Sequence, residues 1–339
     1  MQVKKGFDSD KFVRLESREI SKRASKFDRI YLEFGGHLCY DGHASRVLPG
    51  YRPEAKLEII ERIKDIEVIY CVSSRDIESR KRLGDFRLSY TEQTLRDLKS
   101  FKKHGINVSA VVITMFSGQS AAMKFSIQLR KLGYSVYILP EIKDYLKGPR
   151  YAVNGYKKYD YINVNSKIVV VTGAAGGSGK MATAMSQVYH DLKSGVNAGY
   201  AKVESFPVYN LPISHPVNIA YEAATADLGD FLVYDPYHFA AYNKKAVNYN
   251  RDVKNFSILR DIARIITKEK FPFGYKSPTD MGINLEKSAI TDDSECRNAA
   301  NAEIVRRNEF YSKEFKKGRE SAETLRRMKQ IMKKAKIFL

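Results

Sequence analysis

The sequence predicts a doubly wound, mostly parallel α/β fold of the Rossmann-like kind, with a phosphate-loop-like turn and a helical C-terminal segment. Two observations predict it. Short apolar runs rich in Val and Ile alternate with amphipathic segments over the first two hundred or so residues, and a glycine-rich turn joins one of these runs directly to a helix-like segment. Apolar strands linked through helices are typical of a parallel sheet covered on both faces.

The elements are expected in regular alternation. We expect strands at 29–34, 67–73, 107–114, 135–139, 167–172 and 198–203, and helices between them at 54–64, 91–104, 119–132 and 180–193. Gly105, Gly133 and Gly195 each come just after a helix-like segment, where a left-handed cap residue is favoured. In such a sheet the loops after the first, second, third and fifth of these strands would meet at the carboxyl edge, where ligands bind.

Beyond residue 203 the alternation loosens. We expect a helix at 217–227, a short strand at 231–234, a helix at 256–267 and two helices within 294–336. The domain prediction is an α/β core over 1–290, which could divide near residue 150 or residue 205, followed by a basic helical segment over 291–339.

Composition indicates a soluble, cytoplasmic protein. Of the 339 residues, 43% are hydrophobic and 29% charged, no apolar run approaches the length of a membrane span, and the N-terminus is short and polar. A membrane partner is therefore not expected, and an oligomer is compatible with the sequence. Cys39, Cys71 and Cys296 are too few and too scattered for a disulfide framework, and they suit a reducing compartment.

The net charge of +19 raises the alternative of nucleic-acid binding. From Arg306 onward, twelve Lys and Arg stand against four Glu, a local excess of +8. A nucleic-acid or scaffold function would act through this segment, and a solvated basic helix is the simpler interpretation.

The glycine-rich turn is the strongest chemical signal. Its expected ligand contacts are Gly173, Gly176, Gly177, Ser178, Gly179, Lys180 and Thr183. Glycines let consecutive N–H groups face an anion, the following helix adds its positive end, and Lys180 supplies a cation. The expected ligand is a polyphosphate such as ATP with Mg²⁺, or a small phosphorylated metabolite.

The turn departs from the strict phosphate-loop template at two positions. Ala174 stands where the first glycine belongs, and Met181 stands where the metal-binding hydroxyl belongs. The helical spacing of apolar residues after Lys180 supports a phosphate cradle. The alternative is an ordinary βα turn with Gly179 at a tight bend.

Other polar residues are candidates for the rest of a site. His43 and Arg46 could position an anionic acceptor, because Arg presents a planar fork to phosphate or carboxylate. Two alternatives for this segment are a plain surface loop and a metal site built from its alternating His, Cys and Asp side chains. Arg251 and Lys276 are further substrate-binding candidates.

Asp235 ends an apolar strand, as the magnesium-holding carboxylate of phosphate-loop enzymes does, and His238 could act as an acid or base. The alternative is that Asp235 and Pro236 simply open a turn. A similar local explanation covers 277–280, with Ser277 as an N-cap and Pro278 at the first helical position.

Several of these stretches together resemble the bacterial family known as domain of unknown function 1846. The matching segments, in order, are GFDSDK at 6–11, HASRVLPG at 43–50, GSGKMAT at 177–183, GYAK at 199–202, LP at 211–212, HPVN at 215–218, YEAATADL at 221–228, VNYNRD at 247–252 and KSPTDMG at 276–282. The resemblance implies longer relatives with a further C-terminal portion, and it implies no assigned activity.

Residues 167–203 alone also resemble the opening of phosphate-loop ATP-dependent ligases such as dethiobiotin synthetase. That resemblance implies that Lys202 joins Lys180 at the phosphates as a second catalytic lysine. The leading hypothesis is a cytoplasmic enzyme that performs ATP-dependent phosphoryl transfer or ligation on a small metabolite. One alternative is an enzyme that grips a phosphorylated substrate or coenzyme without hydrolysing a nucleotide, and the other is the basic nucleic-acid-binding or scaffold protein.

Overall fold

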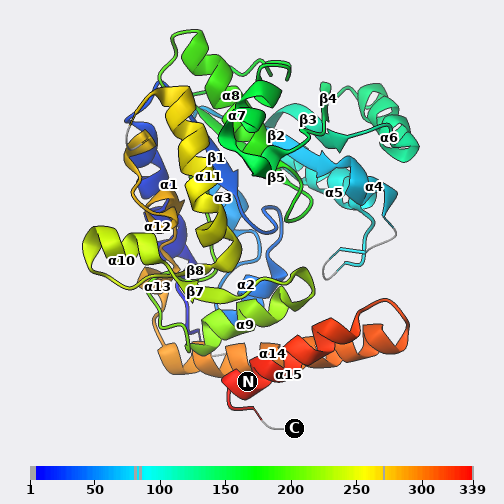
Figure 1. Ribbon diagram of the computed structural model, residues 1–339. Coiled ribbons are helices and arrows are strands. Elements are labelled where there is room, and N and C mark those ends of the chain that lie inside the picture. The colour runs from blue at the N-terminus through cyan, green and yellow to red at the C-terminus, as the bar shows by residue number, and fades with distance from the viewer. Residues whose placement is uncertain (1–4, 80–81, 84–85, 270–271, 338–339) are drawn as a thin grey trace.

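A seven-stranded sheet, with every strand parallel, forms the centre of the molecule in a computed structural model that describes residues 5–79, 82–83, 86–269 and 272–337 (Figure 1). The strand order is β4-β3-β2-β5-β1-β6-β9. The strands are β1 (Arg29–Phe34), β2 (Ile66–Ser73), β3 (Asn107–Phe116), β4 (Val136–Pro140), β5 (Ile168–Gly173), β6 (Ala198–Val203) and β9 (Gly282–Ile283). The predicted fold class is therefore confirmed, and the six predicted strands agree to within two residues at each end.

Helices cover both faces of the sheet because the chain runs across it in two directions. Connections β1 to β2, β2 to β3 and β3 to β4 move toward one edge, whereas β5 to β6 moves toward the other. Right-handed crossovers then place their helices on opposite faces. One face carries α3 (Ala55–Arg62), α5 (Tyr90–Lys103) and α6 (Ser120–Lys131), with α1 (Ser9–Ala24) packed on α3; the other carries the mutually packed α7 (Pro149–Tyr156), α8 (Lys180–Lys193) and α11 (Asn250–Thr267).

A helical layer lies beyond the carboxyl end of the sheet. It consists of α2 (Gly42–Val47), α9 (Pro216–Ala224) and the hairpin of α14 (Asp293–Lys316) and α15 (Ala322–Lys334), with α14 packed on both α2 and α9 (Figure 1). The two C-terminal helices expected within 294–336 are confirmed. Their apolar side chains, such as Tyr311 and Met328, belong to the same hydrophobic cluster as the sheet. Buried residues on both sides of 150 and of 205 also join this cluster.

The remaining elements are short or peripheral. They are α4 (Ser74–Glu78), η1 (Tyr145–Lys147), η2 (Ala226–Leu228), β7 (Leu232–Tyr234), α10 (Pro236–Tyr242), β8 (Val247–Tyr249), η3 (Pro272–Gly274), α12 (Pro278–Met281) and α13 (Glu286–Ala289). None of the helices in the described ranges is long and apolar enough to cross a membrane.

Two elements outside the main alternation differ in how well the sequence predicted them. The short strand expected at 231–234 is present as β7, which pairs antiparallel with β8 in a separate two-stranded sheet. Helix α1 was not predicted at all. Its buried face includes Glu16 and Ser17 beside Phe12 and Ile20, so polar residues interrupt the apolar periodicity that identifies a helix.

Candidate functional site

The glycine-rich turn leaves β5 near the middle of the sheet and leads directly into α8. β5 lies between β2 and β1, and the chain continues from it over β1 to β6. A site at this position faces the crevice outside the carboxyl ends of the strands, where doubly wound folds bind their ligands. The predicted strand, glycine loop and helix are therefore all present and in the predicted order.

The amide groups of this loop are available. From Ala175 to Ala182 no backbone N–H donates a hydrogen bond to another described residue, and Gly179, the N-cap residue of α8, provides no side-chain cap. The Lys180 ammonium, although its residue is 6% exposed, donates only to the Ala175 carbonyl of its own loop, at 3.1 Å. Free amides, a helix N-terminus and a cation thus converge on one bend, as an anion site requires.

Buried hydroxyls surround the same bend. The side-chain oxygens of Thr172 and Ser178 are buried and have no hydrogen-bond partner among the described residues. Thr183 is also fully buried, and its hydroxyl lies toward the Cys71 thiol. Burial raises the pKa of Cys71 to about 12 despite the opposing effects of Thr183 and Lys180, which makes this cysteine an unreactive thiol at neutral pH.

The glycines of the loop meet different steric demands. A Cβ on Gly173 would overlap the Cys71 carbonyl oxygen, and Gly179 adopts a φ of +82° at a place where an added Cβ would overlap the Thr114 side chain. Gly176 and Gly177 face open space, where an added Cβ would have no neighbour within 4 Å. Gly173 and Gly179 are therefore required by packing, whereas Gly176 and Gly177 keep the outer side of the bend clear.

Gly179→Ala is expected to destabilise the protein by about 1–3 kcal/mol, because it combines a left-handed backbone with overpacking. The new Cβ would lie 2.8 Å from Thr114 Oγ1, which now donates to the Ser178 carbonyl at 2.9 Å. Urea unfolding of the variant measures the loss. Gly176→Ala is the matched control and should change stability by less than about 0.5 kcal/mol; equal losses in the two variants would contradict this account of the loop.

A second wall of the site is made of charged residues at the ends of β1 and β6. Glu33 and Lys202 occupy paired positions on these neighbouring strands. Lys202 makes a two-oxygen ion pair with Asp252 of α11, at 2.9 and 3.0 Å, and Tyr200 donates to Glu33. Glu204 follows β6 directly, and its carboxylate occupies the space beside Gly35, where a Cβ would overlap it.

The pKa values of Lys202 and Glu204 in this second wall depend on each other's charge. Burial by itself lowers the pKa of Lys202, but Asp252, Glu33 and Glu204 outweigh that effect and raise it above its ordinary value. Burial raises the pKa of Glu204 to about 7, against the opposing charges of Lys202 and Lys180. Lys180 and Lys202 are thus close enough to act on one carboxylate, so the structure brings the two predicted catalytic lysines to the same region.

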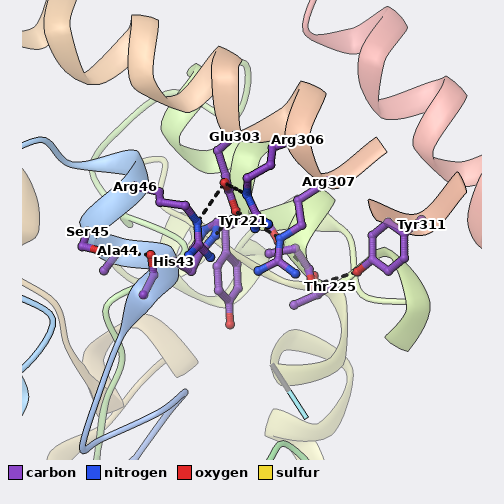
Figure 2. Close-up of polar contacts among 12 residues, drawn as sticks. His43, Ala44, Ser45, Arg46, Tyr221, Thr225, Glu303, Arg306, Arg307 and Tyr311 are labelled. Atoms are coloured by element: carbon purple, nitrogen blue, oxygen red, sulfur yellow. Dashed lines mark hydrogen bonds and ion pairs between the residues drawn. The ribbon is translucent and has the colours of Figure 1, made fainter. Parts of the chain in front are cut away.

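His43 and Arg46 of α2 bind a carboxylate on α14. The Nδ1 atom of His43 and the Nε atom of Arg46 lie 3.3 and 3.0 Å from the two carboxylate oxygens of Glu303, which also binds Arg306 and Arg307 (Figure 2). Burial would raise the pKa of Glu303, but the hydrogen bonds from Arg306 and His43 hold it well below its ordinary range. This arrangement ties α2 to α14 and gives His43 and Arg46 a clear structural role.

Tyr221 separates this cluster from the carboxyl end of the sheet. Its ring stacks on Phe206 and contacts His43, and its hydroxyl points away from Glu303 (Figure 2). Burial lowers the pKa of His43, so the imidazole is neutral at pH 7, and its Nε2 is buried without a described partner.

The remaining predicted residues gather around α10 and α12. Asp235 is fully buried; it caps α10 through Tyr237 N and His238 N and accepts from both the amide and the hydroxyl of Thr279. His238 Nδ1 lies 3.1 Å from the Ser277 hydroxyl, and the Lys276 ammonium lies over the Tyr242 ring. The expected N-cap at Ser277 with Pro278 in the first turn is confirmed.

Arg251 lies nearer the candidate site. It belongs to the first turn of α11, beside the Asp252 that binds Lys202, and it pairs with Asp230 at 3.2 Å. Within the described ranges, no three or more His, Cys, Asp or Glu side chains form a group that could hold a metal ion. The alternating His, Cys and Asp side chains at 37–43 therefore do not assemble into a metal site.

Many of the C-terminal basic residues have intramolecular partners. Arg307 binds Glu303, Lys317 and Arg319 approach Glu314, and Lys334 pairs with Glu222 of α9 at 2.7 Å. Part of the local positive charge is thereby used to hold the hairpin together, and nucleic-acid binding through this segment stays a prediction.

Sequence reasoning missed the carboxylates of the second wall. Glu33 lies inside an otherwise apolar strand, and Glu204 follows directly after another. An acidic residue at the carboxyl end of a predicted parallel strand was the signal available for both. Asp252 belongs to a polar run whose residues gave no indication of which would face the sheet.

Comparison with known proteins places these features in a family. The family model described as "Domain of unknown function DUF1846, N-terminal" matches residues 5–336. Over 333 residues the chain is 45% identical to a "UPF0371 protein" of Clostridium tetani, covering 97% of this chain and 66% of the relative. A "UPF0371 protein" of Streptococcus thermophilus is 42% identical over 333 residues, with 97% of this chain and 67% of the relative covered. The chain thus spans about two thirds of the length of these relatives.

Proposed function

This chain belongs to the uncharacterised DUF1846 family, and we propose that it binds a nucleotide or another phosphorylated ligand at residues 173–183. One observation carries the proposal. The backbone N–H groups from Ala175 to Ala182, before and at the start of α8, donate no hydrogen bond to a described residue, and the Lys180 ammonium donates to the Ala175 carbonyl of the same bend. An anion of several charges would satisfy these donors and release Lys180 from the Ala175 carbonyl.

The chemistry we propose for this site is ATP-dependent phosphoryl transfer or ligation on a small metabolite. Lys180 and Lys202 would neutralise charge that develops on the phosphates, which is the main task of the protein in such reactions. Magnesium would be held largely by the phosphates themselves, and the unpartnered Thr172 hydroxyl is the candidate protein ligand. The acceptor would lie toward the Glu204 carboxylate, which is placed beside Gly35.

A second function, tight binding of a phosphorylated substrate or coenzyme without hydrolysis, is favoured by one observation. Met181 offers no hydroxyl after the loop lysine, and the Asp235 carboxylate is fully occupied by α10 and Thr279. The hydroxyl that the phosphate-loop template places after the lysine is therefore missing, and Asp235, the predicted magnesium ligand, already has four hydrogen bonds within the protein. This alternative predicts binding that does not depend on magnesium.

Lys180→Ala is expected to weaken ATP binding at least a hundredfold, because the variant loses the one loop cation and its charge-assisted hydrogen bonds. Isothermal titration calorimetry with ATP, in the presence and absence of Mg²⁺, measures the effect. Lys193→Ala is the matched control: Lys193 ends the same helix, is exposed, and contacts Tyr189. Its ATP affinity should be unchanged.

Three results would separate the proposals. Magnesium-dependent ATP binding that is lost only in Lys180→Ala supports the nucleotide site. Magnesium-independent binding of pyrophosphate or of phosphorylated metabolites with the same mutational pattern supports the second function. Failure of all of these ligands to bind or to raise the melting temperature of the unmodified protein would refute phosphate binding at this loop.

A further inference from the structure

Glu204 differs from the other carboxylates of the second wall in that its side chain has no hydrogen-bond partner in the described part of the chain. Glu33 accepts from Tyr200, and both oxygens of Asp252 accept from Lys202. The side chain of Glu204 takes part in no hydrogen bond with another described residue, and the residue is only partly buried. Its oxygens therefore remain open to a ligand.

The backbone around Glu204 is built to place this carboxylate at the end of the sheet. Its amide donates to the Ile283 carbonyl of β9, and its own carbonyl accepts from Asn284. Gly35, at the end of β1, has no side chain to keep the carboxylate away. The side chain thus lies over the end of β1, one strand away from the loop at the end of β5.

Charged and titratable groups from six elements or loops face Glu204. They are Glu33 of β1, Tyr200 and Lys202 of β6, Lys180 of α8, Asp252 of α11, Tyr221 of α9, and Tyr209 of the loop after β6. Burial and the two acidic neighbours raise its pKa to about 7, while the two lysines limit the rise. A carboxylate with these properties exchanges protons at neutral pH, as a general acid or base must.

We propose that Glu204 is the acid–base residue of this site and that the acceptor is a small molecule presenting a hydroxyl or amine to it, an inference that rests on nucleotide binding at the adjacent loop. The acceptor oxygen or nitrogen attacks the γ-phosphorus of ATP and forms the new bond to phosphorus. The bond between that phosphorus and the β–γ bridging oxygen breaks, and ADP leaves with the electron pair. The acceptor proton passes to the Glu204 carboxylate and then to solvent.

The test uses water as the acceptor and Mg·ATP as the probe. Unmodified protein and Glu204→Gln are compared for ATP affinity by calorimetry and for phosphate release between about pH 5.5 and 9. We expect ATP affinity within about threefold of the unmodified protein, a 10²- to 10⁴-fold lower rate of hydrolysis, and loss of the rise in rate through pH 7 that deprotonation of Glu204 gives the unmodified protein. The control is Glu54→Gln, an exposed carboxylate at the start of α3, which should keep both rate and pH profile.

Each other outcome rejects the inference. If ATP binds and Glu204→Gln hydrolyses it at the unmodified rate with the same pH profile, Glu204 is not the acid–base residue. If the unmodified protein binds ATP and releases no phosphate at any pH, the proposed step fails although nucleotide binding stands. If ATP does not bind at all, phosphoryl transfer from ATP fails, and this inference falls with it.

Discussion

Glu303→Ala is expected to lower the free energy of unfolding by about 3–5 kcal/mol, the cost of leaving buried charges without their partner. Glu303 is 2% exposed and is the shared acceptor of His43, Arg46, Arg306 and Arg307. Removing its carboxylate leaves three guanidinium groups facing one another between α2 and α14. Urea denaturation at pH 7 measures the loss.

The effect of Glu303→Ala on stability should also depend on pH. The folded-state pKa of Glu303 lies well below its ordinary value of 4.5. Its contribution to stability is therefore complete above about pH 4.5 and is lost as the pH falls toward the folded-state value. The stability difference between the unmodified protein and Glu303→Ala should thus be constant from pH 6 to 8 and shrink in stronger acid.

Glu309→Ala is the matched control for Glu303. Glu309 lies on the same helix, its side chain is 58% exposed, and its contact with Lys313 is 3.9 Å long. Exposed pairs of this kind contribute less than about 1 kcal/mol. A loss below 1 kcal/mol in Glu303→Ala as well would show that the cluster does not hold α14 to α2.

Lys56→Met is expected to cost a similar amount, about 3–5 kcal/mol, at neutral pH. Lys56 is 2% exposed, binds Asp41 at 2.8 Å and donates to the Gly35 carbonyl at 3.1 Å. Methionine preserves the volume but removes the positive charge. The Asp41 carboxylate would then stay buried with only its capping bond to Ala44.

This loss should be larger at alkaline than at acidic pH. Burial raises the pKa of Glu16 to about 8 and raises that of Glu286 well above its ordinary value, and Lys56 is a neighbour that lowers both. A carboxyl group with a raised folded-state pKa contributes stability that is complete below its ordinary pKa and is lost as the pH rises through the folded-state value. Without Lys56 the folded-state pKa values of Glu16 and Glu286 rise further and the loss continues to higher pH, so the stability deficit of Lys56→Met should grow toward pH 9.

Thermal denaturation from pH 5 to 9 tests this expectation, with Lys64→Met as the control. Lys64 follows the same helix and is exposed, so its replacement should be nearly neutral at every pH. A deficit in Lys56→Met that stays the same across this pH range would show that the buried carboxyls do not respond to the Lys56 charge.

The glycine-rich loop after β5 shows which features a local sequence pattern can predict. The β-branched run at 168–171, the glycines after it and the apolar spacing of α8 are contiguous, so the strand, turn and helix could be predicted from neighbouring residues alone. The caps at Gly105, Gly133 and Gly195 were predictable for the same reason, and all three adopt positive φ angles. Phosphate binding by the loop stays a prediction that rests on its free backbone N–H groups.

His43 and Arg46 illustrate the limit of the same reasoning. Their residue types suit an anionic substrate, yet their acceptor is Glu303, which lies 260 positions from His43. Sequence alone could not separate a carboxylate of the substrate from a carboxylate of the protein. Asp235 shows the opposite case, because its capping of α10 is a local interaction at the point where the Asp-Pro pair predicted a turn.

The sequence by itself determined six strands of the central sheet, the helices at 54–64, 91–104, 119–132 and 180–193 between them, and the glycine bend, because each depends on residues within a few turns of one another. The tertiary structure alone decided that β5 lies between β2 and β1, that the Glu204 carboxylate lies beside Gly35 within reach of the Lys180 charge, and that His43 and Arg46 of α2 bind Glu303 of α14. The physical reason is that strand order and the pairing of buried charges depend on which segments, distant in the sequence, pack together. The periodicity of apolar residues, which reveals helices and strands, carries no information about that packing.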